Sequence, residues 1–521
     1  MKTFLERFGS LVLGVLCGFD KLRFRGSKRL LCYPAGVLNY LSQAGVKRTE
    51  YQAYAKQTSL ALCRTIESEA TKQPGMYLYL NNCQQSKEEV ALRLAAQHQR
   101  TQVLIAVLGC LEPCRVVRMR GNRQTKHLEP RIEQGKCLHY YHYYRDPDYG
   151  LRYTRLQTWF PFTMHVGMNG RDWLAEQMTK AGLGYVKKDN CFTWVEDWHA
   201  AQALLDQQLT TDWPGLLEGW AQQSNPMAAT LLQAPVPYYW ATQEAEYATD
   251  IAFRTPEDLG QLYRRLVHFA TELLKSTDVL RFMGYRLTQA GQPRKDMAGE
   301  VMTTIKELVE GTCVKHHALE NLLKMYDKFM QVLRLENLLY RLRDFKVYRT
   351  KEGDPNGKME YLRLRKGVAD LHRRAELGQK INDKYAAALA TVEDSAPLGE
   401  LTGDLGKPVK WKGRSARALN PLAPDDLALL QAVNHGEFIV NGFRNRDLRS
   451  ILFGDAEAST PADAKRQAAK VTRLLRLLRA HSLIAKIPKT HRYQVTPAGR
   501  SKVSALLAAR NADTKKLLQA A

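Results

Sequence analysis

The clearest periodic pattern in the chain lies near its C-terminus. Apolar residues recur there at helical spacing, at Val471, Leu474, Leu475 and Leu478, while basic residues fall on the opposite face. Thr460 precedes this run as an N-cap residue, and Pro461 occupies the first helical position. The pattern therefore predicts an amphipathic helix that begins at Thr460, with one packed face and one cationic face.

Two short strand-like runs follow this helix, at 483–487 and 492–496, and helical sequence resumes at Pro497. The order helix, hairpin, helix in the stretch LLRLLRAHSLIAKIPKTHRYQVTPAGR resembles the MarR and ArsR winged-helix regulators. The resemblance covers the last fifth of the chain. It implies a recognition helix, a strand, a wing and a second strand that together read duplex DNA.

Charge is concentrated in the same segment. From Thr460 onward the chain has fourteen Lys and Arg against two Asp, which is +12 of the formal +24 of the whole chain. A basic helix face is commonly only a solvated face, but here it coincides with the winged-helix pattern. The residues expected to contact nucleic acid in this segment are Arg466, Lys470, Arg473, Arg476, Lys489, His491 and Arg492.

The N-terminal hundred residues are mostly helical by pattern. Thr49 to Ala70 is amphipathic, and a capping box at 86–89 opens a helix over 90–97. The apolar run 11–19 is too short to span a membrane and is interpreted as a buried strand. These features predict a small α-rich unit over residues 1–100.

From residue 101 the pattern changes to alternating strands and later to strands mixed with helices. Strands are expected at 103–111, 115–120, 138–144, 151–159, 164–166, 247–253 and 340–348, and helices at 172–181, 199–207, 213–221, 256–274 and 367–391. Residues 101–393 are therefore predicted to be central α+β domains with an antiparallel sheet. The whole chain is predicted to be an α+β multi-domain protein, ending in the winged helix.

A basic segment separates the predicted central and C-terminal parts. Residues 394–424 are rich in Pro, Gly, Lys and Arg, and we expect them to form a linker that is poorly ordered or lies along nucleic acid. Lys412 and Arg414 are its candidate contacts. The winged-helix domain is then expected over 425–521.

Composition narrows the class of partner. A sequence pI of about 9.6 indicates a polyanion, and nucleic acid is the commonest. No segment is expected to enter a membrane, and the absence of a secretory signal favours the cytoplasm. The nine cysteines show no CxxC spacing, so a zinc ribbon is not expected; Cys110 and Cys114 are interpreted as buried thiols rather than as ligands.

A central stretch offers candidate chemistry. The sequence KMYDK followed by LRLE resembles a short stretch of the replication initiators of filamentous phages and plasmids, which nick DNA. The resemblance implies Mg²⁺ or Mn²⁺ held by carboxylates and an attacking tyrosine. The residues that it implies for a single-stranded DNA path or a divalent-metal site are Tyr326, Asp327, Lys328, Arg334 and Glu336, and Lys324 is a further candidate contact for nucleic acid. Such nickases carry a His-hydrophobe-His pair, whereas here His139 and His142 stand three apart and face opposite sides of a strand.

Two further groups of residues are candidate functional sites. Tyr141 and Tyr143, with Arg152 and Arg155 on the next strand, have the composition of a platform on which unpaired bases stack, although aromatic strand residues are more often core. Glu246 and Asp250 are a second acidic pair that a metal-dependent nuclease would use, against a structural or surface role.

Taken together, the patterns favour a nucleic-acid-binding protein of a bacterial mobile element. DNA is the expected partner, RNA is an alternative, and a homodimer is an option because winged-helix regulators often pair. The alternatives to a nicking or transposition enzyme are a transcription regulator and an RNA-binding protein of a ribonucleoprotein. The chain as a whole also resembles a family of bacterial proteins without an assigned activity, through the stretches RLQTWFPF, KMYDK and THRYQVTPAGR.

Overall fold

The computed structural model describes residues 1–82, 84–285, 287–288, 300–351, 354, 356–392, 402–454, 460–488 and 490–512. The chain folds into two compact units. The first unit comprises Met1–Leu13, Ile251–Asn337 and Lys380–Ala521, and the second comprises Gly14–Asp250 and Leu338–Gln379. Each unit is thus assembled from segments that are distant in the sequence.

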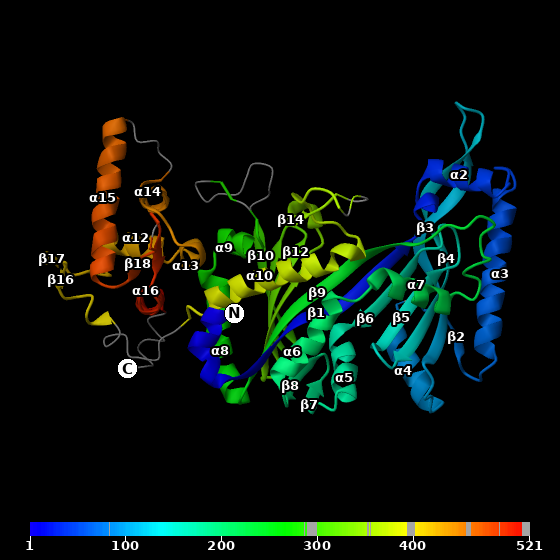
Figure 1. Ribbon diagram of the computed structural model, residues 1–521, viewed down its shortest axis with the longest axis horizontal. Helices are drawn as coiled ribbons and strands as arrows, with labels where there is room; N and C mark the ends of the chain where they lie inside the picture. Colours follow the sequence, from blue (N-terminus) through cyan, green and yellow to red (C-terminus); the bar gives the residue numbers. More distant parts are fainter. Residues whose placement is uncertain are drawn as a thin grey trace. The chain divides into compact units, whose positions relative to one another are not determined.

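The second unit is built on a mixed sheet with the strand order β9-β1-β6-β5-β4-β3-β2 (Figure 1). Strand β2 runs parallel to β3, and the pairs β3–β4, β4–β5, β5–β6 and β6–β1 are antiparallel. The strands are β1 (Val12–Ser27), β2 (Tyr77–Leu80), β3 (Leu104–Gly121), β4 (Leu128–Asp146), β5 (Gly150–Gln157), β6 (Met164–Asn169) and β9 (Tyr239–Phe253).

Helices cover both faces of this sheet. On β3, Val107 packs with the core that contains α3, while its neighbours Ala106 and Leu108 pack with α4, because successive strand residues face opposite sides. The helices of this unit are α2 (Pro34–Gln43), α3 (Tyr51–Thr71), α4 (Lys87–Gln97), α5 (Gly170–Lys180), α6 (Trp198–Asp206) and α7 (Trp213–Ser224). Two small hairpins complete it: β7 (Tyr185–Lys188) with β8 (Cys191–Val195), and β14 (Lys346–Arg349) with β15 (Glu360–Arg363).

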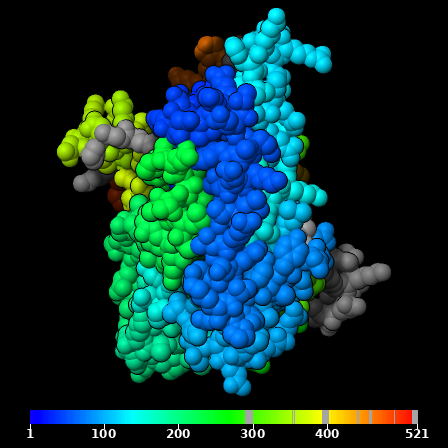
Figure 2. Space-filling view, turned by 90° about the vertical axis from the view of Figure 1, so that its right-hand side faces the viewer, coloured from blue at the N-terminus to red at the C-terminus, as the bar shows by residue number. Residues whose placement is uncertain are grey.

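The strands β3 and β4 are long enough for their connecting turn to stand clear of the helices. The tip of this hairpin projects from the surface of the unit in Figure 2, where it is cyan. Arg123 and Lys126 at the tip are exposed.

The first unit contains the strands β10 (Val301–Leu308), β11 (Gly311–Ala318), β12 (Asn321–Lys328) and β13 (Val332–Leu338). The pairs β10–β11 and β11–β12 are antiparallel. Its helices before residue 400 are α1 (Lys2–Phe8), α8 (Pro256–His268), α9 (Ser276–Phe282) and most of α10 (Leu371–Leu389). Helix α8 begins at the Thr255 cap and continues into a π-helical turn, Phe269–Leu273.

The C-terminal segment of the first unit has a hydrophobic core of its own, which includes Leu430, Val433, Phe443, Leu448, Val471, Leu475, Leu478, Leu483, Val495 and Val503. The elements that contribute to it are β17 (Arg414–Ala416), α12 (Pro424–Val433), α13 (Gly436–Asn441), α14 (Asn445–Phe453), α15 (Pro461–Ala480), β18 (Ile484–Lys486), β19 (Tyr493–Val495) and α16 (Pro497–Arg510). Strand β16 (Val409–Trp411) pairs with β17.

The predicted α+β class is confirmed, as are the helix that begins after Thr460 and the hairpin and helix that follow it. The run 11–19 is indeed a strand, part of β1. The strand predicted over 340–348 is wrong: Leu342–Asp344 is a 3-10 turn, and only 346–349 is extended. Among the described residues, no helix is long and apolar enough to cross a membrane.

The segment predicted as a basic linker differs from that expectation in its described part, residues 402–424. The antiparallel hairpin β16–β17 lies within it, and Leu405 and Leu419 are buried in the core of the C-terminal segment. Apolar residues at these two positions anchor the basic sequence to the folded domain, so that the charges between them are held on a surface.

Candidate nucleic-acid interface

Helix α15 has a sharp division between a buried and a charged face. The side chain of Thr460 accepts a hydrogen bond from the backbone N–H of Asp463 at 3.2 Å, which caps the helix as the sequence predicts. Val471, Leu475 and Leu478 are buried. The cations on the other face are exposed: Lys465, Arg466, Lys470, Arg473 and Arg476.

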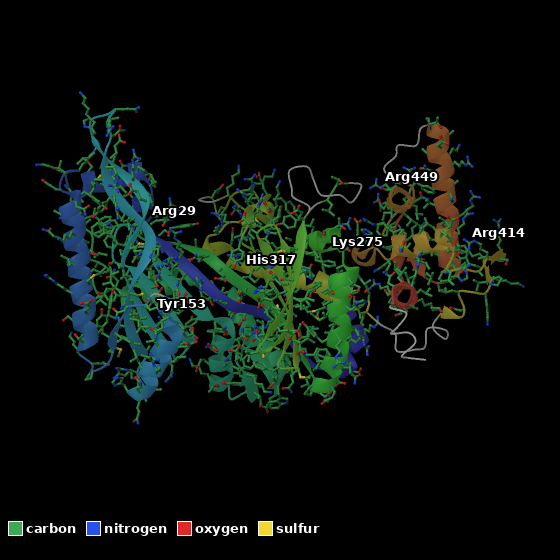
Figure 3. The ribbon with its side chains drawn as sticks, turned by 180° about the vertical axis from the view of Figure 1, so that it is seen from behind. Arg29, Tyr153, Lys275, His317, Arg414 and Arg449 are labelled. Atoms are coloured by element: carbon green, nitrogen blue, oxygen red, sulfur yellow. The ribbon has the colours of Figure 1, made fainter. Side chains whose placement is uncertain are left out.

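The hairpin β16–β17 adds an aromatic residue and more cations beside the C-terminal half of α15. The guanidinium of Arg479 lies over the Trp411 ring at 4.9 Å from its centroid, and the Lys412 ammonium lies at 5.3 Å. The imidazole Nε2 of His481, at the end of α15, donates to the carbonyl oxygen of Arg417 at 2.8 Å. These contacts hold the basic hairpin against the helix, and Figure 3 labels Arg414 at the hairpin.

A groove of about 570 Å³ runs between the hairpin and the helix. Its lining residues are Trp411, Lys412, Arg414, Ser415, Ala416, Arg417, Arg473, Leu474, Arg476, Leu477 and Ala480. The charged residues among them are all cationic. The groove therefore combines a strong positive potential with one aromatic ring, a composition that suits phosphate and bases.

One of these cations is already paired and the rest are not. Arg417 forms a two-pronged ion pair with Asp426, at 2.5 and 2.7 Å, and this bond holds the pKa of the Asp426 carboxyl below its usual value. Within the described part of the chain, Lys412, Arg414, Arg473 and Arg476 have no carboxylate within ion-pair distance. Because no carboxylate in the described segments neutralises them, these four charges are available to an anionic partner.

The second hairpin, β18–β19, continues the basic surface less strongly. His491 and Lys486 are exposed, whereas Arg492 is half-buried. Lys489, the other cation predicted at this tip, lies outside the described residues. The backbone of Tyr493 exchanges two hydrogen bonds with Phe443, at 2.7 and 2.8 Å, and so adds a third extended segment beside the hairpin.

Helix α14 carries cations that the sequence reasoning missed. Arg444 and Arg446 are exposed and Arg449 is half-exposed (labelled in Figure 3). The side-chain amide of Asn445 donates to the Ala468 carbonyl at 3.1 Å and to Thr472 Oγ1 at 3.0 Å, which fixes α14 against α15. The sequence RNRDLR could have indicated this basic helix start, because Asp447 closes a capping box at the start of α14.

The predicted stacking platform lies inside the second unit. Tyr143 and Arg152 are buried, and Arg152 pairs with Asp146 at 2.7 Å. The Tyr141 hydroxyl donates to Glu112 at 2.8 Å, and Arg155 pairs with the same carboxylate at 2.8 Å. Tyr141, Arg152 and Arg155 are therefore engaged in internal hydrogen bonds or ion pairs, and the Tyr143 ring packs against Tyr153 with the ring centroids 5.6 Å apart.

In the predicted catalytic group of the first unit, the two lysines and Glu336 are buried, whereas Tyr326 and Asp327 are half-buried. Lys324 and Lys328 are buried, and they pair with Glu336 at 2.5 Å and Glu310 at 2.7 Å. Burial raises the pKa of the Tyr326 phenol, which opposes its use as a nucleophile at neutral pH. Asp327 is the next residue on the same strand and points to the opposite side, so these two side chains do not act on one phosphate.

Glu246 and Asp250 both lie on β9 in the second unit, on one face of the strand. Asp250 is buried and pairs with Arg171 at 3.0 Å, and Arg171 also donates to the Ala248 carbonyl. A buried carboxylate that pairs with a guanidinium commonly has a structural role, and Asp250 is in this arrangement.

The second unit has a polar cavity of about 630 Å³ between β1, β5, β6 and the β7–β8 hairpin. Its walls carry charges of both signs, including Lys21, Arg23, Glu88, Asp172 and Lys187. Lys187 pairs with Asp172 at 2.8 Å. Mixed and partly paired charges do not select an anion, so the C-terminal groove is the better candidate.

Comparison with family models, with curated proteins and with solved structures finds no match to this chain.

Proposed function

We propose that this protein binds nucleic acid, and specifically duplex DNA, through the basic surface of its C-terminal segment. The observation that carries the proposal is the face of α15: Arg466, Lys470, Arg473 and Arg476 are exposed on a helix whose opposite face is buried. An α-helix with its side chains is about 10 to 12 Å across, which matches a major groove about 12 Å wide.

The arrangement around α15 supports a winged-helix domain. Helices α12, α14 and α15 share one core, and the hairpin β18–β19 is joined by the extended residue Phe443. In this architecture the third helix enters the major groove, and the hairpin contacts the backbone as a wing. Helix α15 would then be the recognition helix, and His491 would lie at the wing.

The hairpin β16–β17 extends this surface beyond a minimal winged helix. A single groove is lined by Lys412 and Arg414 of the hairpin and by Arg473 and Arg476 of α15, so a phosphate backbone that follows the groove contacts several charges at once. Each phosphate that is neutralised releases a counterion, which makes the binding strongly dependent on salt.

The test is a matched pair of variants of the full chain. In the first, Arg466, Lys470, Arg473 and Arg476 are changed together to Ala. In the control, four exposed cations of α3 and α4 are changed to Ala: Lys56, Arg64, Lys72 and Arg93. Both variants lose four positive charges. A difference in DNA binding between them therefore depends on where the charges were removed and not on how many were removed.

The measurement is the dissociation constant for a duplex of mixed sequence across a range of salt concentrations. We expect the α15 variant to bind much more weakly and its logarithmic salt slope to fall in magnitude by up to about 4, at about 0.9 for each lost contact. The control variant should keep the slope of the natural protein. Equal slopes in all three proteins would refute the proposal.

An RNA partner is the alternative, and the same proteins distinguish it. A winged helix that inserts α15 needs the wide major groove of B-form DNA, whereas the major groove of an RNA helix is too narrow for side chains to read. Tighter binding to a hairpin RNA than to a DNA duplex of equal length, with the same loss in the α15 variant, would assign the surface to RNA.

A further inference from the structure

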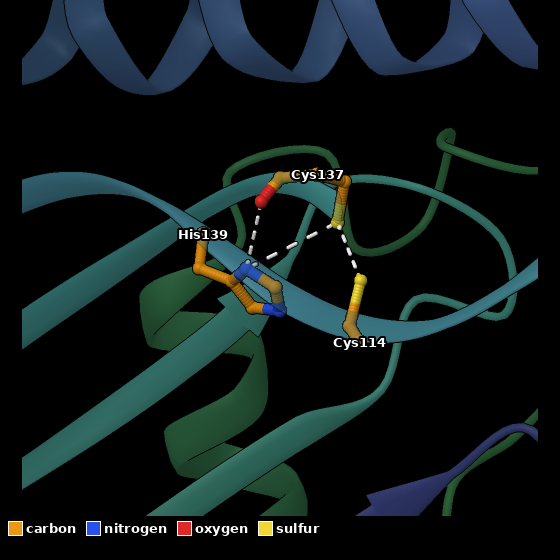
Figure 4. A group of neighbouring side chains, drawn as sticks. All are labelled: Cys114, Cys137 and His139. Carbon is orange, nitrogen blue, oxygen red and sulfur yellow. Dashed lines mark hydrogen bonds between the residues drawn. The ribbon is translucent and has the colours of Figure 1, made fainter. Parts of the chain in front are cut away.

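We propose that Cys114, Cys137 and His139 form a binding site for one zinc ion on the long β3–β4 hairpin of the second unit. The three side chains lie together in Figure 4. Their ligand atoms all lie within 4.8 Å of one another. This proposal is independent of the nucleic-acid interface, because it concerns different residues in a different unit.

The register of the hairpin places the three residues on one face. Cys137 and His139 are two apart on β4, so their side chains point to the same side of the strand. Cys114 on β3 pairs with Gly135, whose neighbour on that face is Cys137. The two sulfur atoms are 3.3 Å apart, and the His139 imidazole lies beside them: its Nδ1, the ring nitrogen that is not the proposed ligand atom, is 4.0 Å from Cys137 Sγ.

The histidine is held in the tautomer that a metal requires. His139 Nδ1 lies 3.0 Å from the carbonyl oxygen of Cys137; since a carbonyl only accepts, Nδ1 carries the proton. The lone pair is then on Nε2, a buried atom without a hydrogen-bond partner in the described structure. A ring nitrogen bonded to a backbone carbonyl, with the other nitrogen free, is the usual setting of a histidine ligand.

Thiolate sulfur and neutral imidazole nitrogen are usual protein ligands of zinc. Binding of Zn²⁺ would release two thiol protons to solvent, and the two thiolates would balance the charge of the ion.

The distances suit zinc after a small adjustment. In a tetrahedral site with Zn–S bonds of 2.3 Å, two sulfur atoms stand about 3.8 Å apart, so the two thiols need to separate by about 0.5 Å. Cys114 is half-exposed, which leaves the fourth position open to a water molecule.

Two neighbouring thiols can also form a disulfide instead of binding a metal ion. It accounts for Cys114 and Cys137 but gives His139 no role and leaves its buried Nε2 without a partner. A metal ion accounts for all three groups, because each supplies one ligand atom. The experiment therefore has to separate metal binding from oxidation.

The test uses the full chain, purified with a reductant, stripped of metal with a chelator and titrated with Co²⁺. We expect one Co²⁺ per chain, with the absorption bands of a thiolate-bound tetrahedral ion, and displacement by one equivalent of Zn²⁺. Cys137→Ser and His139→Gln should each weaken Zn²⁺ binding by more than about a hundredfold, since even the loss of a group that only orients a ligand costs about ten- to a hundredfold.

The controls keep the result interpretable. Cys32→Ser removes another half-exposed thiol of the same unit and should leave Co²⁺ binding unchanged, whereas Cys114→Ser should abolish the thiolate bands. If Cys137→Ser and His139→Gln fail to fold, the Co²⁺ titration of the natural protein still tests whether the site binds metal. Absence of thiolate bands while both thiols are free, or a Cys114–Cys137 disulfide in protein that takes up no metal, would overturn the proposal.

Discussion

The guanidinium of Arg479 lies over the indole ring of Trp411, 4.9 Å from its centroid, and joins the last turn of α15 to the basic hairpin β16–β17. The two residues are 68 positions apart in the chain. Their contact turns a stretch with the composition of a linker into one wall of a cationic groove.

Removal of the indole should loosen this wall. In Trp411→Ala the hairpin loses two cation–π contacts, each of about 0.5 to 1 kcal/mol, and we expect the affinity for duplex DNA to fall about three- to tenfold. The hairpin should also become more sensitive to limited proteolysis. Trp194→Ala, which removes a tryptophan that is 44% exposed on β8, is the control and should change neither readout.

The pair of Arg417 and Asp426 should make the C-terminal segment sensitive to acid. The pKa of Asp426 is lowered in the folded protein by its bond to Arg417, so its contribution to stability is present above the unfolded pKa of about 3.8. That contribution is lost as the pH falls through the folded value.

Asp426→Asn should remove this dependence and cost about 1 to 3 kcal/mol at pH 7, because the charge-assisted bonds of a buried carboxylate are lost. Unfolding in denaturant at pH 7 and below pH 4 measures both effects. An unchanged stability at pH 7 would show that the pair is only a surface contact. Asp425→Asn, at an exposed neighbouring position, is the matched control.

The buried pair of Lys324 and Glu336 should prove structural. Glu336→Gln removes the carboxylate that lies 2.5 Å from the Lys324 ammonium, and we expect a loss of about 3 to 5 kcal/mol in the free energy of unfolding. Glu320→Gln, at an exposed position in the turn between β11 and β12, should change it little. A fully stable Glu336→Gln protein that loses a DNA-nicking activity would instead restore the catalytic interpretation of KMYDK.

His142 should make the second unit less stable below neutral pH. It is buried on β4, and burial lowers its pKa to about 4, below the unfolded value of about 6.5. Between these two values the unfolded chain binds a proton that the folded chain does not. Stability should therefore fall as the pH drops from 6.5 towards 4, by up to about 2 kcal/mol at pH 5.

His142→Phe replaces the ring with one that does not titrate. Its stability should decline less steeply between pH 7 and pH 5 than that of the natural protein, by the equivalent of one proton. Denaturant unfolding at the two pH values provides the comparison. Equal declines would mean that His142 is protonated in the folded state.

The sequence by itself determined the elements whose signals are local. The helix after Thr460 and the hairpin and helix that follow are found because capping, proline placement and helical spacing act within a few residues. The strands 103–111 and 115–120 were also correct, although the structure joins them into one strand through Glu112 and Pro113. The exposed cations of α15 follow from the same periodicity.

Only the tertiary structure decided which polar residues are buried and which meet across strands. The alternation of Lys324, Tyr326 and Lys328 predicts a strand with a polar face, but the pattern does not say that other elements cover that face. Likewise Cys114 and Cys137 are 23 residues apart, and their sulfur atoms meet because of the register of β3 against β4. Register and burial depend on distant parts of the chain, so periodicity within one segment does not specify them.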